Sequence, residues 1–214
     1  GLAECVKHGL IGGEGGDETL LDYLESRLDL VLERERVALT ELVRRNVFVK
    51  AGVVALDERE EASDGGRMAL NLGHTFAHAI ETLPELKWER DENDEEESIP
   101  STQSRGGDDP GLLLHGEAVA VGLVAACAAG ERLGITPAAL SPRVRAMLRR
   151  VGLPVALRGL PGGATLSRRM LDDKKVSAGR LRIVVPAPGA RARVVAGPEA
   201  DVIRAAWATV TQRR

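Results

Sequence analysis

One apolar stretch, AVAVGLVAACAAG at residues 118–130, constrains the fold of this chain more than any other feature. It is shorter than the roughly 20 apolar residues of a membrane-spanning helix, and its many small side chains allow close packing on every side. We therefore expect a buried helix at the centre of the domain and no membrane segment. Aromatic residues make up only 2% of the 214 residues, so Leu, Val and Ala must build the core, which favours packed helices over a β-sandwich.

The periodicity of the other apolar residues predicts a mainly α fold with one small β-hairpin near the C-terminus. Two β-branched runs around Pro-Ala-Pro-Gly predict the hairpin at 181–196. We interpret residues 1–214 as one helical domain. Its expected helices lie at 4–11, at several places within 19–57, and at 71–81, 115–133, 144–153, 166–173 and 201–210.

An acidic segment, residues 88–110, interrupts this pattern with almost no apolar residues and many Ser, Gly and Pro. Such a composition cannot bury a core, so we expect a disordered surface insertion. Because lengthening a loop costs little free energy, this reading outweighs the alternative of an acidic partner-binding arm. The insertion separates the helix expected at 71–81 from His115, which opens the apolar stretch.

Charge and cysteine content exclude several classes of function. The formal net charge of −3 creates no field that would attract nucleic acid or an anionic membrane. Cys5 and Cys127 lie far apart in apolar helical patterns, which indicates two buried thiols in a reducing compartment rather than a disulfide. The first residues, GLAECVKHGLI, lack an initiator Met and the features of a signal peptide, so we expect a piece of a longer chain.

A glycine-rich segment, GGEGGDE at residues 12–18, follows the first expected helix. A phosphate-binding loop would need a Gly-Lys-Ser/Thr sequence, and a dinucleotide-binding turn would need a preceding strand. Neither is present in the sequence at this point. We therefore interpret the segment as a connecting loop.

Half of the four histidines lie in one short motif, NLGHTFAHAIE at residues 71–81. On a helix, His74 and His78 share a face, and Glu81 lies on the same side. A histidine on an apolar helix is more often a packed core residue than a metal ligand, so both interpretations stay open for this pair. The zinc-protease motif HExxH is excluded because Thr75 replaces its glutamate.

Two further polar residues in apolar surroundings, Glu4 and His115, favour a metal site. A carboxylate with two imidazoles is a known ligand set for catalytic zinc, and Glu4, His74 and His115 would supply it. His78, one turn away, would then carry protons at the same site. Taken alone, each of the other cations in these motifs is best interpreted as a solvated surface charge. Together they suit an anionic, polyhydroxylated substrate. These cations are Lys7, Lys50, Arg67, Lys174 and Lys175.

Five blocks of this sequence resemble, in order, the C-terminal half of the 3-dehydroquinate synthase family. They are GLAECVKHGLI, KAGVVALDERE, RMALNLGHTFAHAIE, LLHGEAVAVG and DDKKVSAGRLRIVVP. The resemblance implies a helical domain that packs against an N-terminal NAD-binding domain, with the active site between them. It implies zinc binding by Glu4, His74 and His115 and catalytic roles for His78 and Glu60. It also implies substrate contacts by Lys7, Lys50, Arg67, Asn71 and one of Lys174 or Lys175.

The family is a set of NAD- and metal-dependent lyases of the shikimate pathway, which leads to chorismate and the aromatic amino acids. Its reaction turns 3-deoxy-D-arabino-heptulosonate 7-phosphate into 3-dehydroquinate and phosphate, with zinc or cobalt as the metal. The resemblance further implies a homodimer when full length, a location in the cytoplasm or a plastid, and inactivity of this chain by itself.

Besides lacking the N-terminal NAD-binding half, the sequence departs from the family pattern at two places, and other functions compete. The link at residues 61–66 is longer than usual, which weakens the assignment of Glu60, and the acidic insertion replaces a short loop. The first rivals are another sugar phosphate cyclase and a metal-dependent polyol dehydrogenase of the same architecture, although such dehydrogenases generally use an aspartate where Glu4 stands. A non-catalytic helical module is the second alternative, and it predicts no bound metal.

Overall fold

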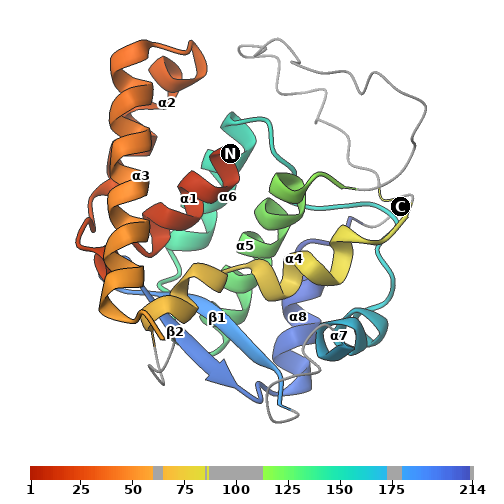
Figure 1. Ribbon diagram of the computed structural model, residues 1–214. Coiled ribbons are helices and arrows are strands. Elements are labelled where there is room, and N and C mark those ends of the chain that lie inside the picture. The colour runs from red at the N-terminus through yellow and green to blue at the C-terminus, as the bar shows by residue number, and fades with distance from the viewer. Residues whose placement is uncertain (60–64, 85, 87–112, 173–179, 213–214) are drawn as a thin grey trace.

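The structure is a computed structural model that describes residues 1–59, 65–84, 86, 113–172 and 180–212. Helices dominate it, and one two-stranded antiparallel sheet lies near the C-terminal end, so the mainly α fold with a small hairpin is confirmed (Figure 1). The acidic insertion at 88–110 lies outside the described residues, as do Glu60, Lys174 and Lys175. The elements are α1 (Leu2–Leu10), η1 (Gly12–Gly15), α2 (Leu20–Leu32), α3 (Arg36–Leu56), η2 (Gly66–Asn71), α4 (His74–Glu81), α5 (His115–Arg132), α6 (Leu140–Arg150), α7 (Gly163–Asp172), β1 (Arg182–Ala187), β2 (Arg191–Ala196) and α8 (Ala200–Thr209).

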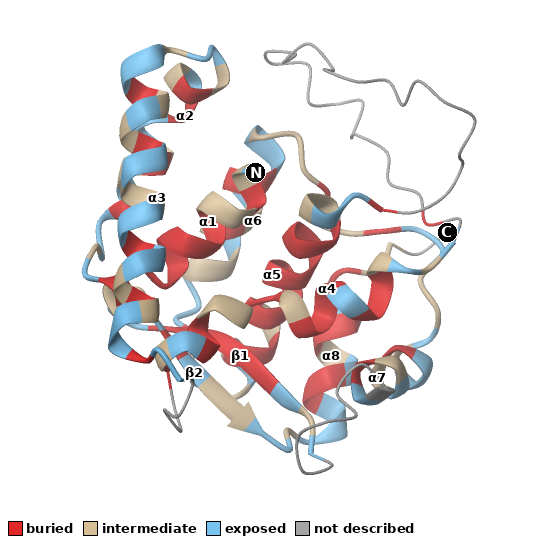
Figure 2. Ribbon diagram, in the orientation of Figure 1, coloured by how far each residue is buried: buried red, intermediate tan, exposed pale blue. Residues whose placement is uncertain are grey.

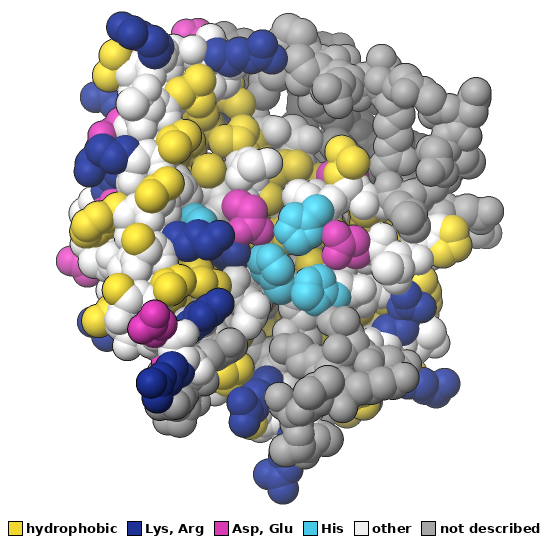
Figure 3. Space-filling view, in the orientation of Figure 1, with side chains coloured by type: hydrophobic (Ala, Val, Ile, Leu, Met, Phe, Trp, Pro, Cys, Tyr) yellow, Lys and Arg dark blue, Asp and Glu magenta, His cyan; other side chains and the backbone are white. Residues whose placement is uncertain are grey.

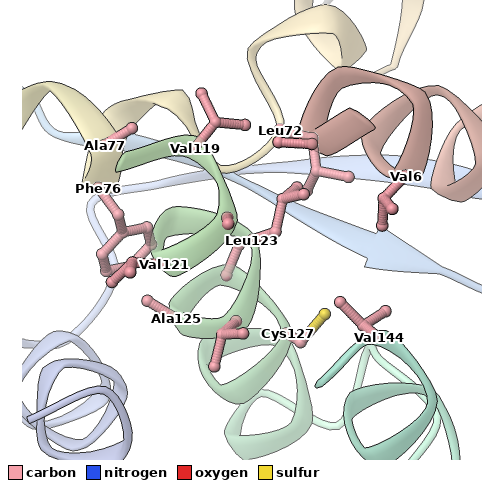
Figure 4. Close-up of a cluster of buried hydrophobic side chains, with 14 of the residues drawn as sticks. Val6, Leu72, Phe76, Ala77, Val119, Val121, Leu123, Ala125, Cys127 and Val144 are labelled. Atoms are coloured by element: carbon pink, nitrogen blue, oxygen red, sulfur yellow. The ribbon is translucent and has the colours of Figure 1, made fainter. Parts of the chain in front are cut away.

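Helix α5 is the centre of the domain, as the apolar stretch predicts. Every residue from Ala118 to Gly130 except Ala128 is buried (Figure 2). The helix packs against α4, α8, β1, α1 and α6, so five elements cover its sides. Figure 4 shows Val119, Val121 and Leu123 of this helix among buried side chains from its neighbours. Among the described residues, no helix is long and apolar enough to cross a membrane.

Helices α4 and α5 approach each other closely at two glycines. A Cβ atom on Gly122 would lie 2.3 Å from the carbonyl oxygen of Gly73, and one on Gly73 would lie 2.9 Å from the backbone nitrogen of Leu123. Gly73 also has φ of +76°, a conformation that glycine adopts without strain. Because the backbone turns here, α4 begins at His74. The prediction that this helix begins at Asn71 is wrong, because Asn71 is the last residue of the short 3₁₀ helix η2.

Helices α2 and α3 form one side of the molecule and cover α1. The Glu35 carboxylate caps the start of α3 by accepting hydrogen bonds from the backbone N–H groups of Val37 (2.9 Å) and Ala38 (2.7 Å). The resulting helix continues without a break to Leu56. Lys50 therefore lies inside one long helix and not at the start of a new one.

The glycine-rich segment at residues 12–18 joins α1 to the hairpin. Gly13 donates its backbone N–H to the carbonyl of Ala190 at 2.8 Å, and the Glu14 carboxylate accepts from the N–H of Ala192 at 3.2 Å. The amide of Gly13 and the carboxylate of Glu14 are thus bonded to the hairpin. This agrees with a connecting loop rather than a phosphate-binding loop.

The two cysteines are free, as expected from their spacing, but they differ in burial. Cys127 is fully buried in α5, and this burial raises the pKa of its thiol to about 12. Cys5 is only partly buried, so the expectation of two buried thiols is right for one of them. Its pKa is also raised, mainly by desolvation.

Candidate metal centre

Three helices bring one ligand-type side chain each to the same point. Glu4 comes from the first turn of α1, and His74 and His115 are the first residues of α4 and α5. Nε2 of His74 lies 3.4 Å from Oε1 of Glu4, and Nε2 of His115 lies 3.7 Å from the same oxygen. One ligand atom from each residue lies within 4.8 Å of the others. The structure thus brings together the three residues that the sequence indicates as metal ligands.

The Glu4 carboxylate has one paired and one unpaired oxygen. Lys7 donates to Oε2 at 2.5 Å, whereas Oε1 is buried without a hydrogen-bond partner and faces the two imidazoles. Burial favours the protonated carboxyl, but the bond and charge of Lys7 outweigh it and hold the pKa of Glu4 below its usual value. An ionised oxygen that is buried and unpaired is costly, and a metal ion at this point would remove that cost.

His74 is held by the backbone just before its helix. Its Nδ1 lies 3.1 Å from the carbonyl oxygen of Leu72, which can only accept, so Nδ1 carries the proton and Nε2 presents a lone pair. Burial, and after it the charge of Lys7, lowers the pKa of His74. The imidazole is therefore in the neutral form that binds metals.

His115 is held by a carboxylate instead. Its Nδ1 lies 3.0 Å from Oε1 of Glu81, the last residue of α4. The sequence placed Glu81 on the face of His74 and His78 but assigned it no role. The contact could not be read from the sequence because α4 and α5 are separated by the acidic insertion.

The arrangement fits zinc. In a tetrahedral site with bonds of about 2.0–2.1 Å, neighbouring ligand atoms lie about 3.4 Å apart. The separations of 3.4 Å and 3.7 Å between Glu4 and the two histidines are close to that value. One carboxylate and two imidazoles leave a coordination position open for water or substrate, as in catalytic zinc sites.

His78 lies on the exposed side of α4, beside the three ligand-type residues. Its ring packs edge-on against that of His74, with 5.7 Å between the ring centroids. Figure 3 shows histidine side chains gathered on this face between acidic groups, with basic side chains to one side. The expected shared face of His74 and His78 is therefore present.

The cations expected at the site differ in their surroundings. Lys7 is buried and paired with Glu4; burial lowers its pKa, and the charge of nearby Lys50 lowers it further. Lys50 is exposed on α3. Arg67 is exposed in η2, where its backbone N–H donates to Asp57 (3.0 Å) and its guanidinium donates to the carbonyl of Glu58 (3.1 Å).

Asn71 ends η2 and is half-buried, three residues before the metal-ligand position of His74. It therefore lies outside the helix of His74 and His78, unlike the expectation from the sequence. Glu60, Lys174 and Lys175 belong to the undescribed part of the chain.

The fourth histidine, His8, was not singled out by the sequence. It is buried between α1 and α3, and its Nδ1 lies 2.9 Å from Oδ1 of Asn46. The amide of Asn46 in turn donates to the carbonyl of Leu42 at 2.8 Å. His8 therefore joins two helices beside the metal-ligand cluster.

The fold resembles that of a solved structure, ValA (2-epi-5-epi-valiolone synthase) from Streptomyces hygroscopicus subsp. jinggangensis 5008 with NAD+ and Zn2+ bound. The TM-score is 0.71 at 23% sequence identity, and the match covers 98% of this chain but 49% of that chain. The chain thus spans about half the length of the solved structure that it matches.

The model of a protein family, 3-dehydroquinate synthase C-terminal, matches residues 1–91 and 107–176. The match includes Glu4, His74 and His115, the three residues of the candidate metal site, and the helices that carry them. This chain belongs to the family of 3-dehydroquinate synthase C-terminal domains.

Proposed function

We propose that this chain is the metal- and substrate-binding part of a 3-dehydroquinate synthase, which converts 3-deoxy-D-arabino-heptulosonate 7-phosphate into 3-dehydroquinate and phosphate. The observation that carries the proposal is the convergence of Glu4, His74 and His115, with a buried carboxylate oxygen left unpaired between the two imidazoles. Membership of the family supports the reaction class.

The residues that would hold zinc are Glu4, His74 and His115. When bound there, zinc supplies Lewis acidity, which lowers the pKa of a substrate hydroxyl and polarises a carbonyl. Lys7 fixes Glu4 by binding its second oxygen, which directs the first oxygen at the two imidazoles. The pairing of Lys7 with Glu4 makes it a support of the metal ligand as well as a candidate substrate contact.

The surrounding polar groups suit a phosphorylated sugar acid. Lys50 and Arg67 are exposed cations that can bind phosphate or carboxylate, and Asn71 can accept and donate hydrogen bonds to hydroxyls. His78 has the side chain best suited to moving protons near neutral pH, and we assign it the proton transfer at the substrate. Glu60 and one of Lys174 or Lys175 complete the proposed set.

NAD is the second cofactor of the proposal, with cobalt as an alternative to zinc. Within the described residues, the glycine-rich segment uses its amides inside the fold and forms no dinucleotide-binding turn. We therefore assign NAD binding, and the redox chemistry that NAD supplies, to an N-terminal domain. The same proposal includes a homodimer of the complete enzyme in the cytoplasm, or in a plastid.

A second candidate is a different sugar phosphate cyclase, and the likeness to ValA favours it as the alternative. Both candidates predict the same metal ligands, so only the substrate separates them. Joined to an NAD-binding domain of the family, the chain should release phosphate from 3-deoxy-D-arabino-heptulosonate 7-phosphate. Turnover of sedoheptulose 7-phosphate instead would establish the alternative.

Zinc binding by the purified chain tests the site itself. We expect elemental analysis to find one zinc ion per chain. Loss of a residue that only hydrogen-bonds a metal ligand typically weakens metal binding about 10–100-fold, and His74→Ala and His115→Ala should each weaken it more. His78→Ala is the matched control, because it removes an imidazole from the same face without removing a ligand. Absence of zinc from the parent chain would defeat the site and support the non-catalytic helical module.

A further inference from the structure

The last residue of α4 contacts the first residue of α5. Oε1 of Glu81 lies 3.0 Å from Nδ1 of His115, while Nε2 of that ring is directed at Oε1 of Glu4, 3.7 Å away. A carboxylate oxygen accepts, so the ring nitrogen facing Glu81 must donate and carry the proton. The other ring nitrogen is left with the lone pair that a metal requires.

We infer that Glu81 is a positioning residue of the metal centre, which holds the ring of His115 in the tautomer and orientation needed for metal binding. This inference rests on the proposed zinc site. Carboxylates that bind the far nitrogen of a histidine ligand orient the ring and strengthen it as a donor.

The two histidine ligands differ in how much support they need. The side chain of His74 is 16% exposed and is held by a backbone carbonyl that cannot move away. The side chain of His115 is 51% exposed at the very start of α5, so packing restricts it much less. The Glu81 carboxylate therefore restricts the ring of His115, as burial restricts the ring of His74.

The position of Glu81 is unfavourable for helix stability alone. The C-terminal end of a helix carries a partial negative charge, so a carboxylate in the last turn costs about 0.3–1 kcal/mol at an exposed site. A lysine or arginine would stabilise α4 better at this position. The acidic residue is thus better explained by its contact with His115 than by the stability of α4.

The last turn of α4 is itself fixed from another helix. Arg169 of α7 donates to the carbonyl of Ala79 at 2.9 Å and to the hydroxyl of Thr82 at 2.7 Å. These bonds hold the backbone of Ala79 before Glu81 and the side chain of Thr82 after it. The carboxylate therefore extends from a fixed point, as a positioning residue requires.

Two variants of Glu81 test the inference. Competition with a chromophoric chelator measures the zinc dissociation constant of each chain, and ¹⁵N NMR of the metal-free chain identifies the tautomer of the His115 ring. We expect Glu81→Ala to weaken zinc binding about 10–100-fold and to lose the single Nδ1–H tautomer. Glu81→Gln keeps a neutral acceptor, so it should retain the tautomer and lose less affinity.

Glu33→Ala is the control, because it removes one negative charge from the exposed end of α2. It should leave zinc affinity within twofold of the parent. Circular dichroism of each variant verifies folding, and Glu81→Gln gives the answer if Glu81→Ala does not fold. If the parent binds zinc and both Glu81 variants bind it equally well, the inference is wrong while the proposed site stands. If the parent binds no zinc, the proposed site fails first.

Discussion

Two half-buried polar clusters in this molecule are built on opposite plans. In the first, Arg45 of α3 donates to Oδ2 of Asp17 at 2.7 Å and also to Oδ1, and a further bond joins it to Thr19 at 2.6 Å. Its guanidinium also lies 4.8 Å from the ring centre of Tyr23. In the second, Glu4 leaves one buried oxygen unpaired between two imidazoles.

The difference separates a cluster whose charges pair within the fold from one that we propose binds a metal ion. Asp17 and Arg45 satisfy each other in a two-point contact that needs nothing from outside the protein. Ligand-type atoms of Glu4, His74 and His115 lie within 4.8 Å of one another, so a bound cation would pair with all three. Stability and binding thus have different structural signatures in the same domain, and three substitutions test this contrast.

The largest effect should come from the contact that places the ligands. Gly122→Val puts side-chain atoms where the carbonyl of Gly73 now lies, because a Cβ alone would come within 2.3 Å. We expect the free energy of unfolding to fall by about 3 kcal/mol or more, and zinc binding to fall with it. Urea unfolding followed by circular dichroism measures the first quantity.

Gly116→Ala on the same helix is the matched control. A Cβ there meets only the Cβ of Ala3 at 4.0 Å, so the fold should tolerate it, with a gain of up to about 1 kcal/mol from helix propensity. Equal unfolding free energies for Gly122→Val and the parent would show that the close approach of α4 and α5 does not set the geometry.

The second effect should come from breaking the fully paired cluster. Arg45→Met removes the charged donor of the Asp17 carboxylate, whose side chain is 13% exposed, and leaves it the hydroxyl of Thr19 at 3.1 Å. We expect a loss of about 2 kcal/mol in unfolding free energy at pH 7. The neighbouring Arg44→Met is the control: Arg44 is exposed and pairs with Glu41 at the surface, so its loss should cost about 0.5 kcal/mol or less.

The pH dependence gives this prediction a sign. Hydrogen bonds from Arg45 lower the pKa of Asp17, so the pair stabilises the fold above the usual aspartate value of about 3.9. That contribution is lost as the pH falls through the lowered pKa. The difference between parent and Arg45→Met should therefore be full at pH 7 and shrink below about pH 4. A constant difference down to pH 2 would contradict the assignment to this charge pair.

The smallest effect on stability should come from the metal-ligand cluster. In the metal-free chain, His115→Ala removes a half-exposed ring, so the unfolding free energy should change by about 0.5 kcal/mol or less. With zinc present, the parent should gain stability by ligand binding and the variant should not. Thermal unfolding with and without zinc distinguishes the two conditions, and a large loss for the metal-free variant would place His115 among the structural residues.

The helices, the buried centre and the three residues that converge at the candidate metal site were predictable from local patterns. The spacing of apolar residues marks α5 as buried, and the spacing of His74 and His78 puts them on one face. The limits of α4 were less accessible: Asn71 was assigned to the helix because nothing in the periodicity signals that the backbone turns at Gly73. At that turn the backbone of α5, which comes from elsewhere in the chain, approaches closely.

Residue type therefore determines which side chains can bind a metal. Their spacing determines which helices carry them, because residues on one face of a helix recur every three to four positions. The contacts of Lys7 with Glu4 and of Glu81 with His115 are of a different kind. The first decides which oxygen of Glu4 stays unpaired, and the second decides which nitrogen of His115 carries the proton. Glu81 and His115 meet only because the whole core packs α4 against α5, and no local pattern records a contact between residues so far apart in the chain.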